Sequence, residues 1–226
     1  MQYKIFGDSL PAVTITLNRG ESLYTQSGGM TWMSDNFTMD TNMKGGLLKG
    51  LGRMLTGESL FMATYTAQAD GAEITFASTF PGSIVAADIS QGNIIIQKSA
   101  FLCAQPTVEL SMYVTKGITS GLFGGEGFLL QRLAGQGMAF FEVDGTCVEK
   151  ELAPGEVLKV DTGNVAAFQE SVGYNVERVK GFKNVLFGGE GLFLTKLTGP
   201  GKVWLQTMPL TRFASRLIPF LPRKED

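Results

Sequence analysis

The sequence predicts an all-β protein built from three copies of one antiparallel β-sandwich module. The first observation is a duplication, because the hexapeptide at 122–127 (Leu-Phe-Gly-Gly-Glu-Gly) returns letter for letter at 186–191. The second is a weaker copy at 56–61 (Thr-Gly-Glu-Ser-Leu-Phe), which aligns with the Gly-Glu step and the Leu-Phe pair of the third copy. The third is a succession of short apolar segments separated by turn residues, which is typical of β-strands.

The repeats extend over the whole chain. Ten of nineteen positions agree between 122–140 and 186–204, and the glutamates Glu58, Glu126 and Glu190 are 68 and 64 residues apart. The copies therefore divide the chain at approximately 1–80, 81–150 and 151–226. Units below roughly 70 residues rarely hold an independent core. We therefore expect residues 1–226 to form a single compact body, in which three β repeats surround a pseudo-threefold axis.

The strands of these modules are expected at segments with two kinds of pattern. Residues 13–17 alternate between apolar and polar side chains, and 175–179 form a shorter stretch rich in β-branched residues. More uniformly apolar segments, expected at central positions, occur at 73–76, 84–87, 94–96, 100–103, 128–130, 138–141, 165–168, 192–194 and 203–205. Turn signals such as Asp70-Gly71, Asp144-Gly145 and Pro154-Gly155 separate the strands.

Two segments depart from the β pattern. At 43–55, Leu47, Leu48 and Leu51 recur at helical spacing beside the cations Lys44, Lys49 and Arg53, which predicts a short amphipathic helix. Its four glycines make it a poor isolated helix, so its order must come from packing or from a partner. The tail at 210–218 favours two helical turns that end near Pro219 and Pro222.

Composition narrows the class of protein. Apolar residues make up 44% of the chain and charged residues 18%, which is typical of a well-buried globular protein. The net charge of −2 disfavours general nucleic-acid binding. No apolar run is long enough to span a membrane and the N-terminus lacks a secretion signal, so we expect a cytoplasmic protein. Its two cysteines, Cys103 and Cys147, are expected to be buried and reduced.

The sequence contains no catalytic signature. Without a histidine it cannot build a Ser-His-Asp relay or a His-ligated metal site, and it lacks a Walker loop and a dinucleotide fingerprint. We therefore expect no catalytic residue, no metal and no cofactor. Glu58, Glu126 and Glu190 are the candidate binding residues, because carboxylates that converge on an axis could bind a cation or small ligand. The alternative is structural: each glutamate would accept backbone hydrogen bonds in a tight turn.

The basic segment 43–55 has two interpretations. Cations facing lipid headgroups and leucines facing acyl chains are what an interfacial helix requires, so Lys44, Lys49, Arg53, Leu47, Leu48 and Leu51 are candidate membrane or partner contacts. The alternative is that the leucines pack on the core of the protein itself.

Several of these motifs together resemble a known family. They are Gly28-Gly29-Met30, the run from Met43 to Leu55, Gly57-Glu58-Ser59, and the two later Phe-Gly-Gly-Glu-Gly steps. The chain resembles the bacterial family related to the mitochondrial-biogenesis protein called altered inheritance of mitochondria. This resemblance implies a fold similar to that of the tryptophan RNA-binding attenuator protein, with β-sandwich modules around a pseudo-threefold axis. It implies no catalytic residues.

Three functions stay open at this level. The first is a non-enzymatic scaffold or binding protein that forms a homo-oligomer, either a trimer or a ring, through apolar strands whose edges need covering. The second is a peripheral membrane protein that uses 43–55 and the tail at 210–221. The third is a cation-binding or small-ligand protein, of unknown ligand, with a site between the repeats.

Overall fold

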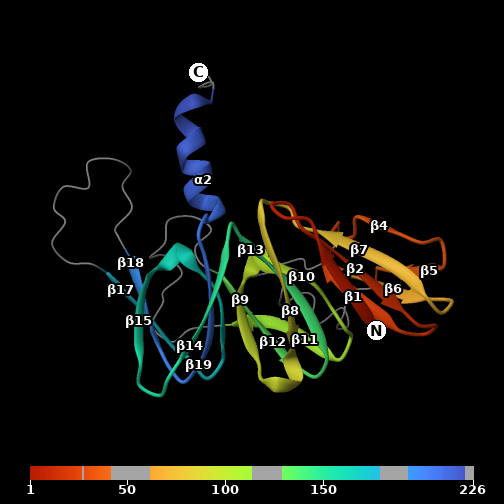
Figure 1. Ribbon diagram of the computed structural model, residues 1–226, viewed down its shortest axis with the longest axis horizontal. Coiled ribbons are helices and arrows are strands. Elements are labelled where there is room, and N and C mark those ends of the chain that lie inside the picture. The colour runs from red at the N-terminus through yellow and green to blue at the C-terminus, as the bar shows by residue number, and fades with distance from the viewer. Residues whose placement is uncertain (27, 42–61, 114–128, 179–192, 222–226) are drawn as a thin grey trace, which may run out of the picture. The chain divides into compact units, whose positions relative to one another are not determined.

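Strands dominate the part of the chain that the structure describes, which comprises residues 1–26, 28–41, 62–113, 129–178 and 193–221. The computed structural model arranges them in antiparallel sheets, and the described residues include one short α-helix near the C-terminus (Figure 1). The prediction of an all-β protein is therefore confirmed. The predicted helix at 43–55 lies outside the described residues.

The chain divides into two units, each of which contains two sheets. Unit 1 comprises Met1–Gln91, Ala100–Glu109 and Ala134–Glu142, and unit 2 comprises Gly92–Ser99, Leu110–Leu133 and Val143–Asp226. The division of the chain into repeats at approximately 1–80, 81–150 and 151–226 stays a prediction.

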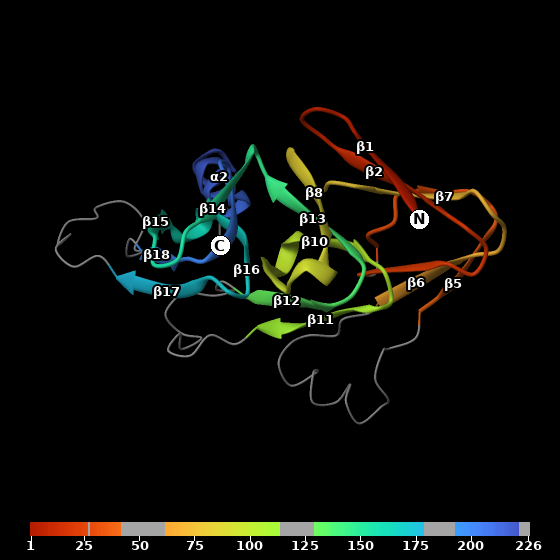
Figure 2. The same cartoon turned by 60° about the horizontal axis from the view of Figure 1, so that its bottom comes forward.

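Unit 1 combines a four-stranded sheet of order β1-β2-β7-β4 with a six-stranded sheet of order β5-β6-β3-β10-β13-β8. Figure 2 shows β1, β2 and β7 in one layer and β5 and β6 in another. The bounds are β1 Gln2–Phe6, β2 Ala12–Leu17, β3 Ser22–Gln26, β4 Trp32–Met33, β5 Phe37–Asp40, β6 Met62–Ala67, β7 Ala72–Ala77, β8 Gly82–Asp88, η1 Ile89–Gln91, β10 Phe101–Ala104 and β13 Met138–Asp144.

The core of unit 1 lies between these two sheets. Val13, Ile15 and Leu17 alternate along β2 and are fully buried, as the period-two pattern predicts. They pack in one cluster with Phe76 of β7 and Phe140 of β13. Each such side chain contributes roughly 1.5–3 kcal/mol on burial, so the apolar face of each strand specifies the sandwich.

Unit 2 combines a six-stranded sheet of order β11-β12-β9-β16-β19-β14 with a three-stranded sheet of order β15-β18-β17. Its core includes Ile95, Phe168, Leu197 and Val203, which come from both sheets. The bounds are β9 Ile94–Gln97, η2 Lys98–Ala100, β11 Val108–Tyr113, β12 Leu130–Gly135, β14 Cys147–Leu152, β15 Val157–Asp161, η3 Thr162–Asn164, β16 Val165–Gln169, β17 Gly173–Arg178, β18 Phe193–Thr198, β19 Gly201–Gln206, α2 Leu210–Leu217 and η4 Ile218–Phe220.

One order of neighbouring strands occurs three times along the chain. We call β2–β7, β8–β13 and β14–β19 the first, second and third strand sets. In each set, the fifth strand lies between the second and fourth, and the sixth lies between the first and third. Thus β6 lies between β3 and β5, β12 between β9 and β11, and β18 between β15 and β17. The strand β1 precedes the first set and pairs with β2.

The turns follow the glycine signals. Gly71 and Gly145 adopt φ of 73° and 71°, a left-handed conformation that residues with a β-carbon avoid. They follow Asp70 and Asp144, as the predicted turns require. The predicted tail helix is also confirmed, since α2 and the 3₁₀ turn η4 occupy residues 210–220. Cys103 is fully buried, whereas Cys147 at the start of β14 is only half-buried, which corrects the expectation of a second core thiol.

Candidate functional site

The six residues predicted to contact a membrane or partner and the three candidate binding glutamates lie outside the described residues. They are Lys44, Leu47, Leu48, Lys49, Leu51, Arg53, Glu58, Glu126 and Glu190. The segments that contain them join neighbouring antiparallel strands: 42–61 joins β5 to β6, 114–128 joins β11 to β12, and 179–192 joins β17 to β18. Each glutamate therefore belongs to the connection between the fourth and fifth strands of its set. The binding site expected from them stays a prediction.

Charged side chains in the described ranges do not form a metal site, because no three Cys, Asp or Glu side chains cluster there. The most buried carboxylate among them is Glu142, near the end of β13. It accepts hydrogen bonds from Ser78 Oγ at 2.7 Å, Thr79 N at 2.9 Å and Thr79 Oγ1 at 2.9 Å. These three donors compensate the burial of its charge, so Glu142 holds the turn after β7 to β13.

Several titratable side chains have pKa values that differ from their ordinary values. Burial raises the pKa of the Cys103 thiol well above its usual value, and burial together with Glu149 raises the pKa of Cys147 to about 11. Neither thiol is then a thiolate at neutral pH. Hydrogen bonds from Arg132 and Asn93 lower the pKa of Glu170, so this carboxylate stays ionised. None of these three groups is tuned toward neutral-pH acid–base chemistry.

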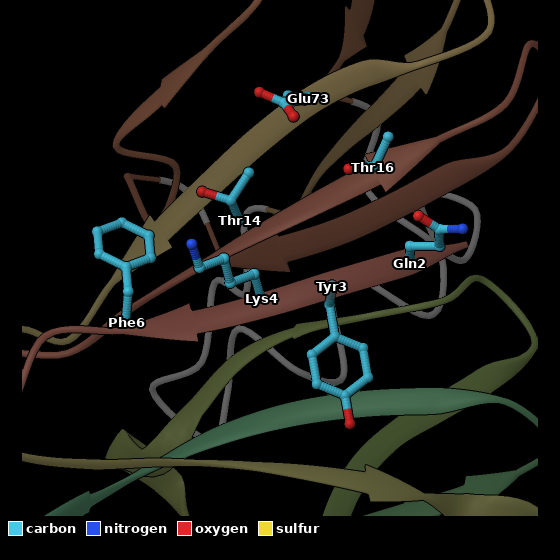
Figure 3. Close-up of a pocket in the computed structure, with 7 residues that line it drawn as sticks. All are labelled: Gln2, Tyr3, Lys4, Phe6, Thr14, Thr16 and Glu73. Atoms are coloured by element: carbon cyan, nitrogen blue, oxygen red, sulfur yellow. The ribbon is translucent and has the colours of Figure 1, made fainter.

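A shallow pocket of about 480 Å³ lies on the outer face of the four-stranded sheet of unit 1 (Figure 3). It is lined by Gln2, Tyr3, Lys4, Phe6, Thr14, Thr16 and Glu73. Figure 3 shows the Tyr3 ring turned away from Lys4 and Phe6, and it packs edge to face on Phe140 with ring centroids 5.1 Å apart. One cation, one carboxylate, one amide and two threonine hydroxyl groups offer hydrogen bonds to a polar ligand, but they include no strong nucleophile with an adjacent base.

A second shallow pocket, of about 550 Å³, lies at the turns of unit 2. It is lined by Glu151, Leu152, Ala153, Pro154, Glu156, Gln169, Ser171, Pro200 and Gly201. Glu156 accepts a hydrogen bond from Ala153 N at 2.9 Å, and Gln169 Oε1 accepts one from Lys202 N at 2.8 Å. These polar groups close the turns between strands, which favours a structural role.

Each of the four sheets has two edge strands in the described chain. The four-stranded sheet ends on β1 and β4, and the three-stranded sheet ends on β15 and β17. Trp32 of β4 is 53% exposed and Val157 of β15 is 45% exposed. We call β4 and β15 the open edges. Unpaired backbone groups beside exposed apolar side chains are a template for pairing with another strand.

The helix α2 presents a second exposed apolar surface. Leu210, Phe213 and Leu217 recur at helical spacing, and no residue of α2 is buried. Figure 1 shows the helix extending away from the strands of unit 2. Its start is fixed by the Arg212–Asp161 ion pair at 2.6 Å and by a hydrogen bond of 2.8 Å from Leu210 N to Asp144 Oδ2. Of the helices in the described ranges, none has the length and apolarity to cross a bilayer.

Comparison with known proteins identifies the family. The family described as mitochondrial biogenesis AIM24 matches residues 3–208, which is most of the chain. The chain belongs to the AIM24 family. The predicted resemblance to this family is confirmed, and the likeness to the attenuator protein stays a prediction. The match ends just before α2, so the exposed helix lies beyond the AIM24 region.

Two streptococcal proteins are similar to this AIM24-family chain. The uncharacterized protein M6_Spy0233 of Streptococcus pyogenes serotype M6 is 30% identical over 224 residues, covering 96% of this chain and 89% of that protein. The crystal structure of protein SPYM3_0169 from Streptococcus pyogenes matches with a TM-score of 0.78 and 26% identity, covering 97% of this chain and 99% of the other. Neither name describes an activity, so membership of the AIM24 family carries the fold and leaves the function to the structural argument.

Proposed function

We propose that this AIM24-family protein is a non-enzymatic scaffold or binding protein that works as a homo-oligomer. The open edges carry the proposal, because β4 and β15 each have an outer side that is unpaired in the described chain, beside a half-exposed apolar side chain. Association of identical chains covers two edges at once.

The architecture of the proposed protein is three modules of one kind that follow one another along the chain. The three strand sets run over residues 12–77, 82–144 and 147–206, close to the repeats predicted at 1–80, 81–150 and 151–226. Each set has the same order of neighbours. A module that occurs three times in one chain uses the same contact surface between successive modules. The first and third modules then each have one such surface unused.

The setting of the proposed protein is the cytoplasm. Cys103 and Cys147 are both free, and burial raises the pKa of each thiol, so neither is readily oxidised. Reduced cysteines are the rule in the cytoplasm.

The proposal is tested by multi-angle light scattering of the purified chain over a concentration series in the micromolar range. A mass that is a multiple of 24.3 kDa and falls on dilution supports a homo-oligomer. A mass of 24.3 kDa at every concentration would remove the proposal.

A second candidate function is peripheral attachment to an anionic membrane through α2. The exposed Leu210, Phe213 and Leu217 favour it, since apolar side chains on one side of a helix are what an interface takes up. Sedimentation with phosphatidylserine vesicles tests it. Phe213→Glu with Leu217→Glu would abolish binding, whereas Thr211→Glu with Ser215→Glu adds the same charge to the polar side and would reduce binding far less. Equal loss from both pairs would contradict insertion of the apolar side.

A further inference from the structure

The two six-stranded sheets are built from the same two halves. One half contains the fourth, fifth and second strands of a set, as in β5-β6-β3 and β11-β12-β9. The other half contains the third, sixth and first strands of the next set, as in β10-β13-β8 and β16-β19-β14. The halves meet where the second strand of one set pairs with the third strand of the next, at β3·β10 and β9·β16. We call these contacts the two joints.

The two smaller sheets are the same halves without their counterparts. The three-stranded sheet, β17-β18-β15, contains the fourth, fifth and second strands of the third set. The four-stranded sheet contains β4, β7 and β2, which are the third, sixth and first strands of the first set, followed by β1. The open edges β15 and β4 are therefore the two strands that form a joint at the other two places.

We infer that β15 of one copy of the chain pairs with β4 of a second copy. The contact joins the three-stranded and four-stranded sheets into one sheet that repeats the strand order of the two six-stranded sheets, with β1 added beside β2. The inference rests on the proposed homo-oligomer and identifies its interface. Because the two edges differ, the contact is head to tail, and repetition of it gives a closed ring or an open chain.

The joints predict the register of this contact. At β9·β16, Ile95 lies opposite Phe168, and Ile96 lies opposite Ala167. Leu133 aligns with Leu197 in the duplicated sequence. Leu133 pairs with Ile94, and Leu197 pairs with Leu158, so Leu158 corresponds to Ile94. The next residue, Lys159, therefore corresponds to Ile95.

The same comparison places the partner residue on β4. Leu152 pairs with Gly201 and Leu17 pairs with Ala72, each at the last position of the first strand of its set. Gly201 therefore corresponds to Ala72, and two residues further along the sixth strand Val203 corresponds to Ile74. Val203 pairs with Phe168 and Ile74 pairs with Met33, so Met33 corresponds to Phe168. The predicted register therefore puts Lys159 opposite Met33, and Val160 opposite Trp32.

The length of β4 is sufficient for such a contact. β4 contains two residues, and the two joints register one and three residue pairs. Burial at the joints also differs from burial at the open edges. Ile96 and Ala167 are 0% and 1% exposed, whereas Trp32 at the corresponding position is 53% exposed. The predicted contact would remove this apolar side chain from water.

Charge supports the same register. Across the β9·β16 joint, Arg132 of β12 makes hydrogen bonds of 2.7 and 2.8 Å to the two carboxylate oxygens of Glu170. Lys196 aligns with Arg132 in the duplicated sequence, and Asp35 stands two residues after Met33 as Glu170 stands two after Phe168. Lys196 of β18, the neighbour of β15, and Asp35, two residues after the end of β4, thus correspond to the two residues of the ion pair at the joint.

The test uses two variants, Lys159→Cys and Met33→Cys, each in a Cys147→Ser background. The fully buried Cys103 is then the one other thiol in each protein. The two proteins are mixed and oxidised, and the products are separated on a non-reducing gel. A covalent dimer that forms in the mixture, and far more slowly with either protein alone, is expected. Lys159→Cys mixed with Thr38→Cys, at the edge of β5, is the matched control and should give little dimer.

The other outcomes separate the interface from the function. An oligomer by light scattering without a disulfide between the Lys159→Cys and Met33→Cys proteins would overturn this interface and leave the homo-oligomer intact. A chain carrying both substitutions that closes its disulfide as a monomer would overturn pairing with a second copy. A monomeric wild-type chain would overturn both proposals.

Charge reversal gives an independent measurement. Asp35→Lys alone and Lys196→Asp alone should each weaken self-association by about three- to tenfold, the range expected for one partly exposed ion pair. The two changes together in one chain should restore most of the affinity, because the pair is re-formed with opposite polarity. Failure of the double variant to recover would count against the predicted register.

Discussion

The two joints use the same backbone pairing but different side chains. At β3·β10, Tyr24 lies opposite Ala104, stacks on Phe101 with ring centroids 5.5 Å apart, and donates a hydrogen bond of 2.9 Å to the Val108 carbonyl oxygen. At β9·β16 the corresponding residue is Ile95, and the Arg132–Glu170 ion pair lies on the neighbouring strand and turn. The same order of strands is therefore compatible with different side-chain contacts. One joint is dominated by a buried aromatic ring, and the other by aliphatic packing with a partly exposed ion pair.

The largest effect is expected at the aromatic joint. Tyr24→Ala removes a fully buried ring and should lower the free energy of unfolding by about 3–5 kcal/mol. Equilibrium denaturation in urea measures it. Tyr3→Ala on β1 is the control, because Tyr3 is 46% exposed and its loss should cost far less. Equal losses at Tyr24 and Tyr3 would show that the joint is not a centre of stability.

A smaller effect isolates the hydroxyl group of the same residue. Tyr24→Phe keeps the ring and leaves the buried Val108 carbonyl oxygen without its donor, so it should cost about 1–2 kcal/mol. Tyr65→Phe is the matched control, since Tyr65 is also buried and its hydroxyl group has no hydrogen bond in the described residues. A change in stability for Tyr65→Phe as large as that for Tyr24→Phe would contradict this assignment.

A buried amide lies on β12, beside the second joint. Gln131 of β12 pairs with Ile96, is fully buried, and has no hydrogen-bond partner for either side-chain polar atom within the described residues. Gln131→Met keeps the volume and removes the uncompensated polar group, so the free energy of unfolding should rise by about 1 kcal/mol. Thermal denaturation measures the change. A clear decrease would mean that the amide is hydrogen-bonded in solution.

The smallest effect is expected from the ion pair. Glu170→Gln should cost under about 1 kcal/mol, because Arg132 and Glu170 are each roughly one-third exposed and are screened by water. The pKa of Glu170 is lowered by Arg132 from its ordinary 4.5, so its contribution is fully present above pH 4.5 and is lost as the pH falls through the lowered value. Comparison of wild type and variant at pH 7 and pH 3 should show the difference shrinking. Glu73→Gln, on the outer face of unit 1, is the control.

The apolar strands were predictable because their signal is local. Val13, Ile15 and Leu17 alternate, and Ile94–Ile96 form a short apolar run, so the burial of each strand follows from its own residues. The turn glycines Gly71 and Gly145 were predictable for the same reason, since a left-handed conformation selects glycine.

Polar and very short strands were not predictable. The side chains of β1 are all exposed and four of the six in β14 are exposed, so neither strand has the clean alternation of a half-buried strand. β4 has only two residues. Their assignment depends on pairing with β2, β19 and β7, which is a property of the tertiary fold.

The candidate site could be predicted only in part. The glutamate repeat drew attention to Glu58, Glu126 and Glu190, which lie outside the described residues. The pair Arg132 and Lys196 was visible in the duplicated sequence as a repeated cation, but its partners Glu170 and Asp35 become recognisable only when the strand order is known. The open edges likewise result from topology, because no property of residues 32–33 or 157–161 alone says that their outer side is unpaired.

Amide hydrogen exchange of the unmodified protein, measured by mass spectrometry across a concentration series, tests most directly whether the open edges pair in solution. If β15 and β4 form a joint between copies, peptides containing 157–161 and 31–34 will be protected at high concentration nearly as well as those containing 94–97 and 165–169, and will lose protection on dilution. Fast exchange at 157–161 and 31–34 at every concentration, beside slow exchange at the two joints, would contradict it.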